Sequence, residues 1–270
     1  MKQTRKLINS LVACTIAIAM VSSVAAQTAI DGAAKVIRVK GPARYTTGNN
    51  VWQPLRVGTV VRPGTTIQTS TEKGSFVDLV LGDINAPMPS PVSFKPYIPS
   101  SYATSTSYQP TAEQNVVRVW ENTALGIDKL TAMQSGAELV TETQLDLKAG
   151  RITGSVKKMS AASKYEVKLP NGVAGIRGTV FDITAEGVVR VFVGSMVVAW
   201  VDPKTGNVIT QVVMGGQSYD ARTNQITPIS EPEMQSFERL VVSLRFFEPV
   251  TETMLASDKT IINISPVGPP

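Results

Sequence analysis

The chain has 270 residues, of which 43% are hydrophobic and 17% are charged, a balance typical of a folded globular protein rather than a disordered one. It contains no histidine and a single cysteine, Cys14, which excludes Cys/His zinc sites, Ser-His-Asp triads and Cys-His dyads. The formal net charge is +5.

Residues 1–26 have the anatomy of a secretory signal peptide. A basic start precedes an apolar run at residues 11–24, and Val24-Ala25-Ala26 offers small residues for cleavage before Gln27. We therefore expect export to the periplasm or to the outside of a bacterial cell. Cleavage would leave 23 basic and 21 acidic residues, and a net charge of +2 gives no general attraction to nucleic acid.

Two alternatives exist for this segment. Leu11-Val12-Ala13-Cys14 resembles a lipoprotein signal, but the apolar run continues past Cys14, so we interpret the match as coincidence. A retained membrane anchor is disfavoured because polar residues such as Asn9 and Ser22 interrupt the run. The mature chain is then expected to have no integral membrane span and no cysteine, so its stability must come from a core and not from disulfides.

Short strand-like segments separated by Gly, Pro and Asn fill most of residues 27–229 and predict an all-β domain. The segments that we interpret as strands are 36–39, 51–55, 66–69, 76–81, 116–120, 124–127, 142–147, 152–156, 165–168, 179–184, 188–193, 196–201 and 208–214. The last three are expected to form successive hairpins, with Gly194 as one of the turns. This rhythm fits a β-solenoid-like or β-sandwich body.

Residues 84–114 interrupt the rhythm. They contain six of the 17 prolines, no glycine, and three tyrosines, Tyr97, Tyr102 and Tyr108. Proline at this density favours an extended backbone and cannot support a sheet ladder. The segment is either a tolerated surface insertion or a recognition loop, in which case the tyrosines are possible partner-binding residues.

One helix is predicted, at residues 230–249. Ser230 and Glu233 form a capping box with Pro232 in the first turn. Apolar residues then recur at helical spacing, at Met234, Phe237, Leu240, Val241, Leu244 and Phe247. We expect an amphipathic helix that closes the β-body, with residues 250–270 as a tail; docking to a partner is the alternative.

The stretch LPNGVAGIRGTVFDIT, residues 169–184, has the glycines of a phosphate-binding loop without its context. A helix should follow such a loop, whereas residues 179–184 alternate as a strand. In that strand Phe181 and Ile183 are expected to face one way and Val180 and Asp182 the other.

VAGIRGTVFDI resembles the signature of the FecR domain, an exported bacterial module. VWQPLRVGTVVRPGTTIQTS, LDLKAGRI, VRVFVGSMVV and VVMGGQ match further family motifs in the same order, over about residues 35–220. The matching positions that we expect to be structural are Trp52, Pro54, Leu55, Gly58, Gly64, Gly150, Arg177, Gly178, Thr179, Phe181 and Asp182.

The resemblance implies an exported, non-enzymatic module that mediates protein–protein interaction, scaffolding or sensing in the cell envelope, with no catalytic residue, cofactor or metal. Sensor members also carry an anti-sigma segment and a transmembrane helix; a signal peptide stands here instead, so we do not carry over the anti-sigma activity. The expected partner is an envelope protein or a cell-wall glycan. The alternative function is binding of peptidoglycan or another polysaccharide. A carboxylate-based hydrolase has no positive support in the sequence, although the residues present do not exclude it.

Two expectations concern single side chains. Arg177 should pair with Asp182 or Asp146 and pin the glycine corner, or else present its guanidinium to a partner. Trp52, Trp120 and Trp200 lie in strand-like segments, which predicts that they belong to the core.

Overall fold

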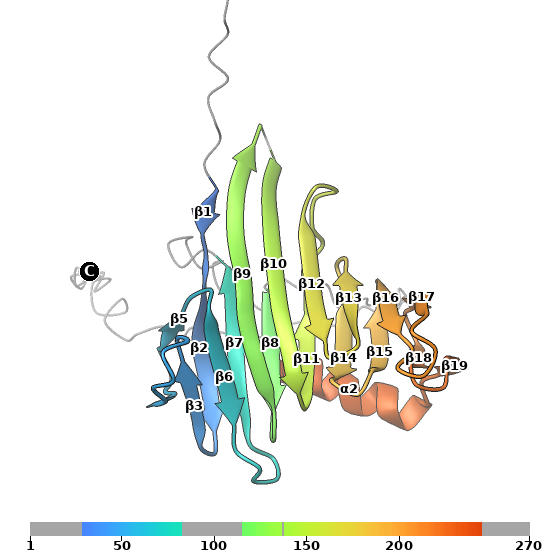
Figure 1. The fold of residues 1–270 in the computed structure, drawn as a ribbon, viewed down its shortest axis with the longest axis horizontal. Helices are drawn as coiled ribbons and strands as arrows, with labels where there is room; N and C mark the ends of the chain where they lie inside the picture. Colours follow the sequence, from blue (N-terminus) through green and yellow to red (C-terminus); the bar gives the residue numbers. More distant parts are fainter. Residues whose placement is uncertain (1–28, 83–114, 137, 245–270) are drawn as a thin grey trace, which may run out of the picture.

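The computed structural model describes residues 29–82, 115–136 and 138–244 (Figure 1). The expected signal peptide, the insertion at 84–114 with Tyr97, Tyr102 and Tyr108, and the tail at 250–270 lie outside these residues. So do residues 245–249 of the predicted helix.

Strands form two sheets, which confirms the all-β prediction. In spatial order, the ten-stranded sheet consists of β17 (Val208–Met214), β16 (Ser195–Val201), β13 (Gly172–Ile176), β12 (Lys164–Leu169), β10 (Glu138–Ala149), β9 (Ala124–Ser135), β6 (Thr65–Thr69), β3 (Ala43–Thr46) and β4 (Gln53–Pro54), with β1 (Ile30–Asp31) paired to β9. The nine-stranded sheet consists of β19 (Gln225–Pro228), β18 (Gln217–Asp220), β15 (Val188–Val193), β14 (Val180–Thr184), β11 (Arg151–Ser155), β8 (Asn115–Trp120), β7 (Phe76–Gly82), β2 (Ala33–Lys40) and β5 (Val60–Val61).

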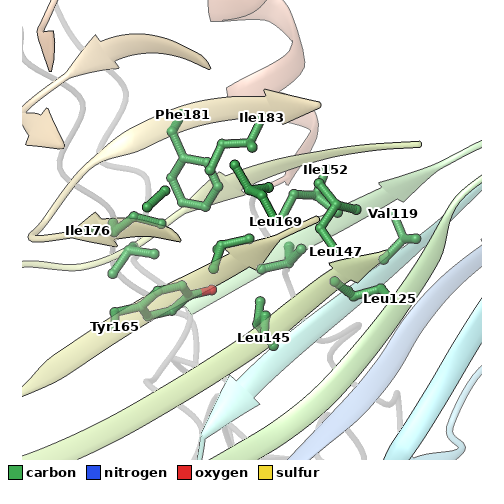
Figure 2. Packing of buried hydrophobic residues seen from close by; sticks show 14 of the residues in the cluster. Val119, Leu125, Leu145, Leu147, Ile152, Tyr165, Leu169, Ile176, Phe181 and Ile183 are labelled. Atoms are coloured by element: carbon green, nitrogen blue, oxygen red, sulfur yellow. The ribbon is translucent and has the colours of Figure 1, made fainter. Parts of the chain in front are cut away.

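The two sheets pack face to face as a sandwich. One buried apolar cluster contains inward-facing side chains of both, for example Phe181 and Ile183 from β14 opposite Leu145 and Leu147 from β10 (Figure 2). Alternation along each strand places these side chains in the core. The expected orientation of Phe181 and Ile183 is therefore confirmed.

The chain changes sheet repeatedly while it advances along both of them, from β2 and β3 at one end to β18 and β19 at the other (Figure 1). Glycines with positive φ stand at several of these crossings, including Gly150 between β10 and β11 and Gly194 between β15 and β16. The prediction of a hairpin at Gly194 is wrong, because β15 and β16 lie in different sheets. The periodic glycines thus mark changes of sheet as well as hairpins.

Two predicted strand boundaries also differ from the structure. Of the expected strand 51–55, only Gln53 and Pro54 form a strand, β4, while the Leu55 N–H still donates to the Ala43 carbonyl oxygen at 2.8 Å. The segment 169–184 contains an additional strand, β13, in which Gly172 and Gly175 take part. Sequence patterns predicted no strand here because glycine usually weakens a strand. Here a Cβ on Gly172 would lie 2.4 Å from the carbonyl oxygen of Ala199, so close packing requires glycine.

Helix α2 (Glu231–Leu244) packs on the outer face of the nine-stranded sheet, away from the core. Phe237 and Val241 cover Val180 and Phe192, and Leu244 contacts Ile37 and Val116. One half of the predicted capping box is confirmed: the Ser230 N–H donates to the Glu233 carboxylate at 3.2 Å, and the Ser230 hydroxyl donates to the same carboxylate at 2.8 Å. These hydrogen bonds lower the pKa of Glu233.

Gly154 of β11 provides the space for the Phe181 ring. A Cβ on Gly154 would lie 2.3 Å from Cζ of Phe181. The Phe181 ring also packs edge-to-face against the Tyr165 ring, with 6.5 Å between their centroids. The Tyr165 hydroxyl is buried without a hydrogen-bond partner among the described residues, and burial raises its pKa. The core at this point is therefore tightly filled and uncharged.

We expect Gly154→Ala to lower the free energy of unfolding by about 1–3 kcal/mol, because the new methyl group would displace the Phe181 ring. Chemical denaturation measures the change. Gly175→Ala is the matched control, since its Cβ would have no neighbour closer than 3.8 Å. Equal stability of the two variants would contradict the packing described here.

Candidate interaction site

The predicted signature forms the corner between β13 and β14. Gly178 has a φ of +65°, and a Cβ there would lie 3.0 Å from the Cα of Lys158. Thr179 is buried, and its hydroxyl donates to the Ser195 carbonyl oxygen at 2.8 Å. The corner at Gly178 is thereby fastened to the neighbouring crossing at 194–195. Gly178, Thr179 and Phe181 thus serve the fold.

The earlier motif residues also lie at turns and at the rim of the core. The Gly58 N–H donates to Val36 O and the Gly64 N–H to Ile127 O, each at 2.8 Å. Leu55 is buried and belongs to the core cluster. Gly150, with a φ of +82°, lies so close to Asn122 that a Cβ would be 2.5 Å from its carbonyl oxygen.

The tryptophans occupy three different environments. Trp200 is buried in the core, as predicted. Trp52 is 40% exposed beside the short strand β4, and the Arg44 guanidinium stacks over its ring at 4.5 Å. Trp120 is half-buried on the outer face of the nine-stranded sheet. The core prediction is therefore wrong for Trp52 and Trp120. Trp52 lies beside a strand of only two residues, and Trp120 lies on the sheet face that points away from the core.

The expected pairing of Arg177 is wrong. Its side chain is exposed and forms no ion pair with a described residue. Asp182 is bound by other groups, and Asp146 is next to Lys148, at 3.8 Å. The reason is position: Asp182 lies within β14 and is flanked by residues of β11 and β15, whereas Arg177 lies in the exposed turn that precedes β14.

Asp182 is fully buried on the outer face of the nine-stranded sheet and accepts three hydrogen bonds. Arg151 Nε donates at 2.7 Å, the Thr153 hydroxyl at 2.7 Å and Arg190 Nη1 at 3.3 Å. A buried carboxylate is strongly unfavourable unless charged donors compensate it. The acidic residue of the signature is therefore an anchor for two cross-strand arginines.

A second buried carboxylate repeats the arrangement three strands away. Arg118 donates to both oxygens of Asp78, from Nε to Oδ1 at 2.7 Å and from Nη2 to Oδ2 at 2.8 Å. The same Oδ2 lies 2.9 Å from Arg38 Nε. The Arg118 guanidinium also stacks over the Phe76 ring at 4.0 Å. Bidentate pairing with stacking holds this guanidinium in one orientation.

Trp120 connects the two centres. Arg118 and Arg151 approach its ring at 5.3 and 5.2 Å, and its indole N–H donates to the Thr153 hydroxyl at 2.8 Å. Strand register then places the polar residues in one cross-strand row: Arg38, Asp78, Arg118, Thr153, Asp182 and Arg190.

We call Arg38, Arg118, Arg151 and Arg190 the guanidinium cluster. Against Asp78 and Asp182, these four cations leave a local charge of +2. The side chains of Arg38, Arg151 and Arg190 are 39%, 45% and 31% exposed, so each can still direct donors outward. Arg38 already does so, because its Nη2 donates to the Ser243 carbonyl oxygen of α2. The cluster can therefore bind carbonyl or carboxylate oxygens in fixed geometry.

Sequence patterns indicated only part of this site. The alternation in residues 179–184 placed Asp182 opposite Phe181, but it did not reveal burial or partners. Arg151 and Arg190 come from strands on either side of β14 and lie 31 and 8 residues away from Asp182 in the chain. The signal that could have found them is the recurrence of one arginine or aspartate in the middle of otherwise apolar strands.

Within the ranges that the structure describes, no three Asp, Glu, His or Cys side chains gather closely enough to hold a metal ion. No helix in the described part of the chain is long and apolar enough to cross a membrane.

Comparisons with known proteins give a family match to part of the chain and distant structural neighbours. The model of the FecR protein family matches residues 107–196. Two crystal structures of a proposed anti-sigma factor from Parabacteroides distasonis ATCC 8503 are 13% identical, with TM-scores of 0.32 and 0.34 and coverage of 45% and 48% of this chain. The match spans 53% and 57% of those chains. Among curated proteins there is no match.

We expect Asp182→Ala to destabilise the protein by about 1–3 kcal/mol, because it leaves the buried Thr153 hydroxyl and the inward-facing donors of Arg151 and Arg190 without their acceptor. Denaturant unfolding followed by circular dichroism measures this. The control is Asp220→Ala, which removes a partly exposed partner of Arg222 and should cost far less. A similarly small loss for Asp182→Ala would refute the anchoring role.

Proposed function

We propose that this chain is a FecR-type, non-enzymatic regulatory or sensing module that acts by binding another protein in the bacterial cell envelope. The match of the FecR family model to residues 107–196 supports the regulatory or sensing role. The envelope location rests on the signal-peptide pattern of residues 1–26. The binding role rests on the guanidinium cluster.

The observation that supports binding over catalysis is the state of the two carboxylates in this site. Asp78 and Asp182 are fully buried and saturated with donors from arginine and threonine. A general acid or base must reach its substrate, whereas these groups face only their own partners. What reaches solvent is the outer part of three guanidiniums, which suits recognition of acidic groups.

The expected partner surface is acidic and presents carboxylates or unpaired carbonyl groups. A cluster of fixed guanidiniums loses little conformational freedom on binding, so its hydrogen bonds contribute more fully to affinity. Binding through such contacts should weaken as salt is raised, because exposed charges are screened. The rings of Phe76 and Trp120, over which Arg118 and Arg151 stack, add apolar contact area next to the charges.

The test is capture from an envelope extract with the purified protein and with the double variant Arg151→Gln/Arg190→Gln. We expect about a tenfold or greater loss of the captured protein in the variant, because charged hydrogen bonds are lost. Arg222→Gln removes the same type of charge elsewhere and should capture as well as the native protein. Unchanged capture by the double variant, with its fold verified by circular dichroism, would rule out this site.

A second candidate function, glycan binding, is favoured by the exposed Trp52. Its ring lies beside Arg44, which also donates to Gln68 at 2.6 and 2.9 Å, and close in sequence to Gln53, which accepts from Tyr45 at 2.8 Å. An exposed aromatic ring surrounded by polar donors and acceptors suits stacking against sugars.

The same preparations separate the two candidates. Retention on purified cell-wall polysaccharide that is lost in Trp52→Ala, but not in Arg151→Gln/Arg190→Gln, would support glycan binding. Capture of a protein that depends on the arginines and not on Trp52 would support the first proposal.

A further inference from the structure

The four edges of the two sheets are not equally protected. Strands β4 and β5 each have two residues, and β4 includes Pro54. Strand β19 has four residues and ends with Pro228. Short strands and prolines are the usual means of preventing edge-to-edge association. Among the described strands, β17 is the exception: its seven residues, VITQVVM, contain neither proline nor charge.

An exposed apolar surface adjoins this edge. On the outer face of β16 and β17, Val197 lies opposite Val212 and Val201 opposite Val208. Their exposed fractions, together with that of Met214, are 41–66%. Contiguous exposed apolar residues on one sheet face are typical of an interaction surface.

The free edge has a definite hydrogen-bond register. The Met214 N–H donates to the Gln217 side chain, and the Val212 carbonyl accepts from the Gln211 side chain, so both groups point away from β16. In an antiparallel strand the outward groups recur at every second residue. Val208, Thr210, Val212 and Met214 therefore present their backbone groups at the edge.

This register is compatible with its own copy. A two-fold axis at Gln211 would set Thr210 opposite Val212 of the second copy and Val208 opposite Met214. All four positions point outward, so each pair can exchange backbone hydrogen bonds once Met214 N–H and the Val212 carbonyl release the side chains of Gln217 and Gln211. The absence of charge in β17 means that self-pairing brings no like charges together.

We propose that two copies of this chain associate through antiparallel pairing of their β17 strands about a two-fold axis at Gln211. The ten-stranded sheets of the two copies would become continuous, and their exposed valines would form one surface. An interface of this size is small, so the dimer is expected to be concentration-dependent. The guanidinium cluster lies on the other sheet and stays accessible. The inference therefore stands independently of the proposed function.

Introducing a charge at the two-fold axis, at Gln211, tests this arrangement. Gln211 is half-buried, and its counterpart in the second copy would lie directly opposite. We expect Gln211→Lys and Gln211→Glu each to weaken the dimer by about tenfold or more, because like charges meet at the axis. An equimolar mixture of the two variants should regain dimerisation. Sedimentation velocity over a concentration series measures the dimer dissociation constant of the native protein, of each variant and of the mixture.

Thr227→Lys, which adds the same charge on strand β19 at the edge of the nine-stranded sheet, is the control and should leave the dimer unchanged. Circular dichroism and thermal unfolding verify that the Gln211 variants keep their fold. A native protein that stays monomeric up to about 200 µM would overturn the proposal. So would single variants that dimerise like the native protein, or a mixture that does not recover.

Discussion

Two carboxylates buried on the outer face of a sheet constrain this molecule more than any other interaction. Asp78 and Asp182 have no exposed surface, and each is compensated by arginines from the strands on either side. A shift of one residue in the pairing of those strands would turn the charges to the opposite face and leave them uncompensated in the apolar core. The ion pairs therefore specify the register of the nine-stranded sheet.

The same face also receives the C-terminal helix. Val180 and Phe192 form an apolar strip beside the charged row, and α2 covers this strip with Phe237 and Val241. Arg38 connects the two parts, since it contacts Asp78 and donates to the carbonyl of Ser243 near the end of α2. Binding of an acidic partner at the guanidinium cluster would therefore occur next to the helix and would compete with this contact.

Local patterns in the sequence predicted much of the fold. Most strands, the capping box at Ser230 and the burial of Phe181 follow from alternation, capping preferences and turn residues. The pairing partners did not follow: Arg177 was expected to bind Asp182, whereas Arg151 and Arg190 do so. Such contacts depend on which strands become neighbours, and the glycine crossings that decide this are indistinguishable from hairpin turns in the sequence. The exposed position of Trp52 depends likewise on how little of its segment is paired.

Each buried carboxylate and its arginine act as one unit in stabilising the sheet. The most direct measurement is a double-mutant cycle on Asp78 and Arg118 by denaturant unfolding, with Asp78→Ala, Arg118→Ala and the double variant. We expect a coupling free energy of about 2 kcal/mol or more, because Asp78→Ala leaves the buried Arg118 guanidinium without a carboxylate and Arg118→Ala leaves the buried Asp78 with Arg38 alone. A coupling below about 0.5 kcal/mol would contradict the account, since the two residues would then contribute independently.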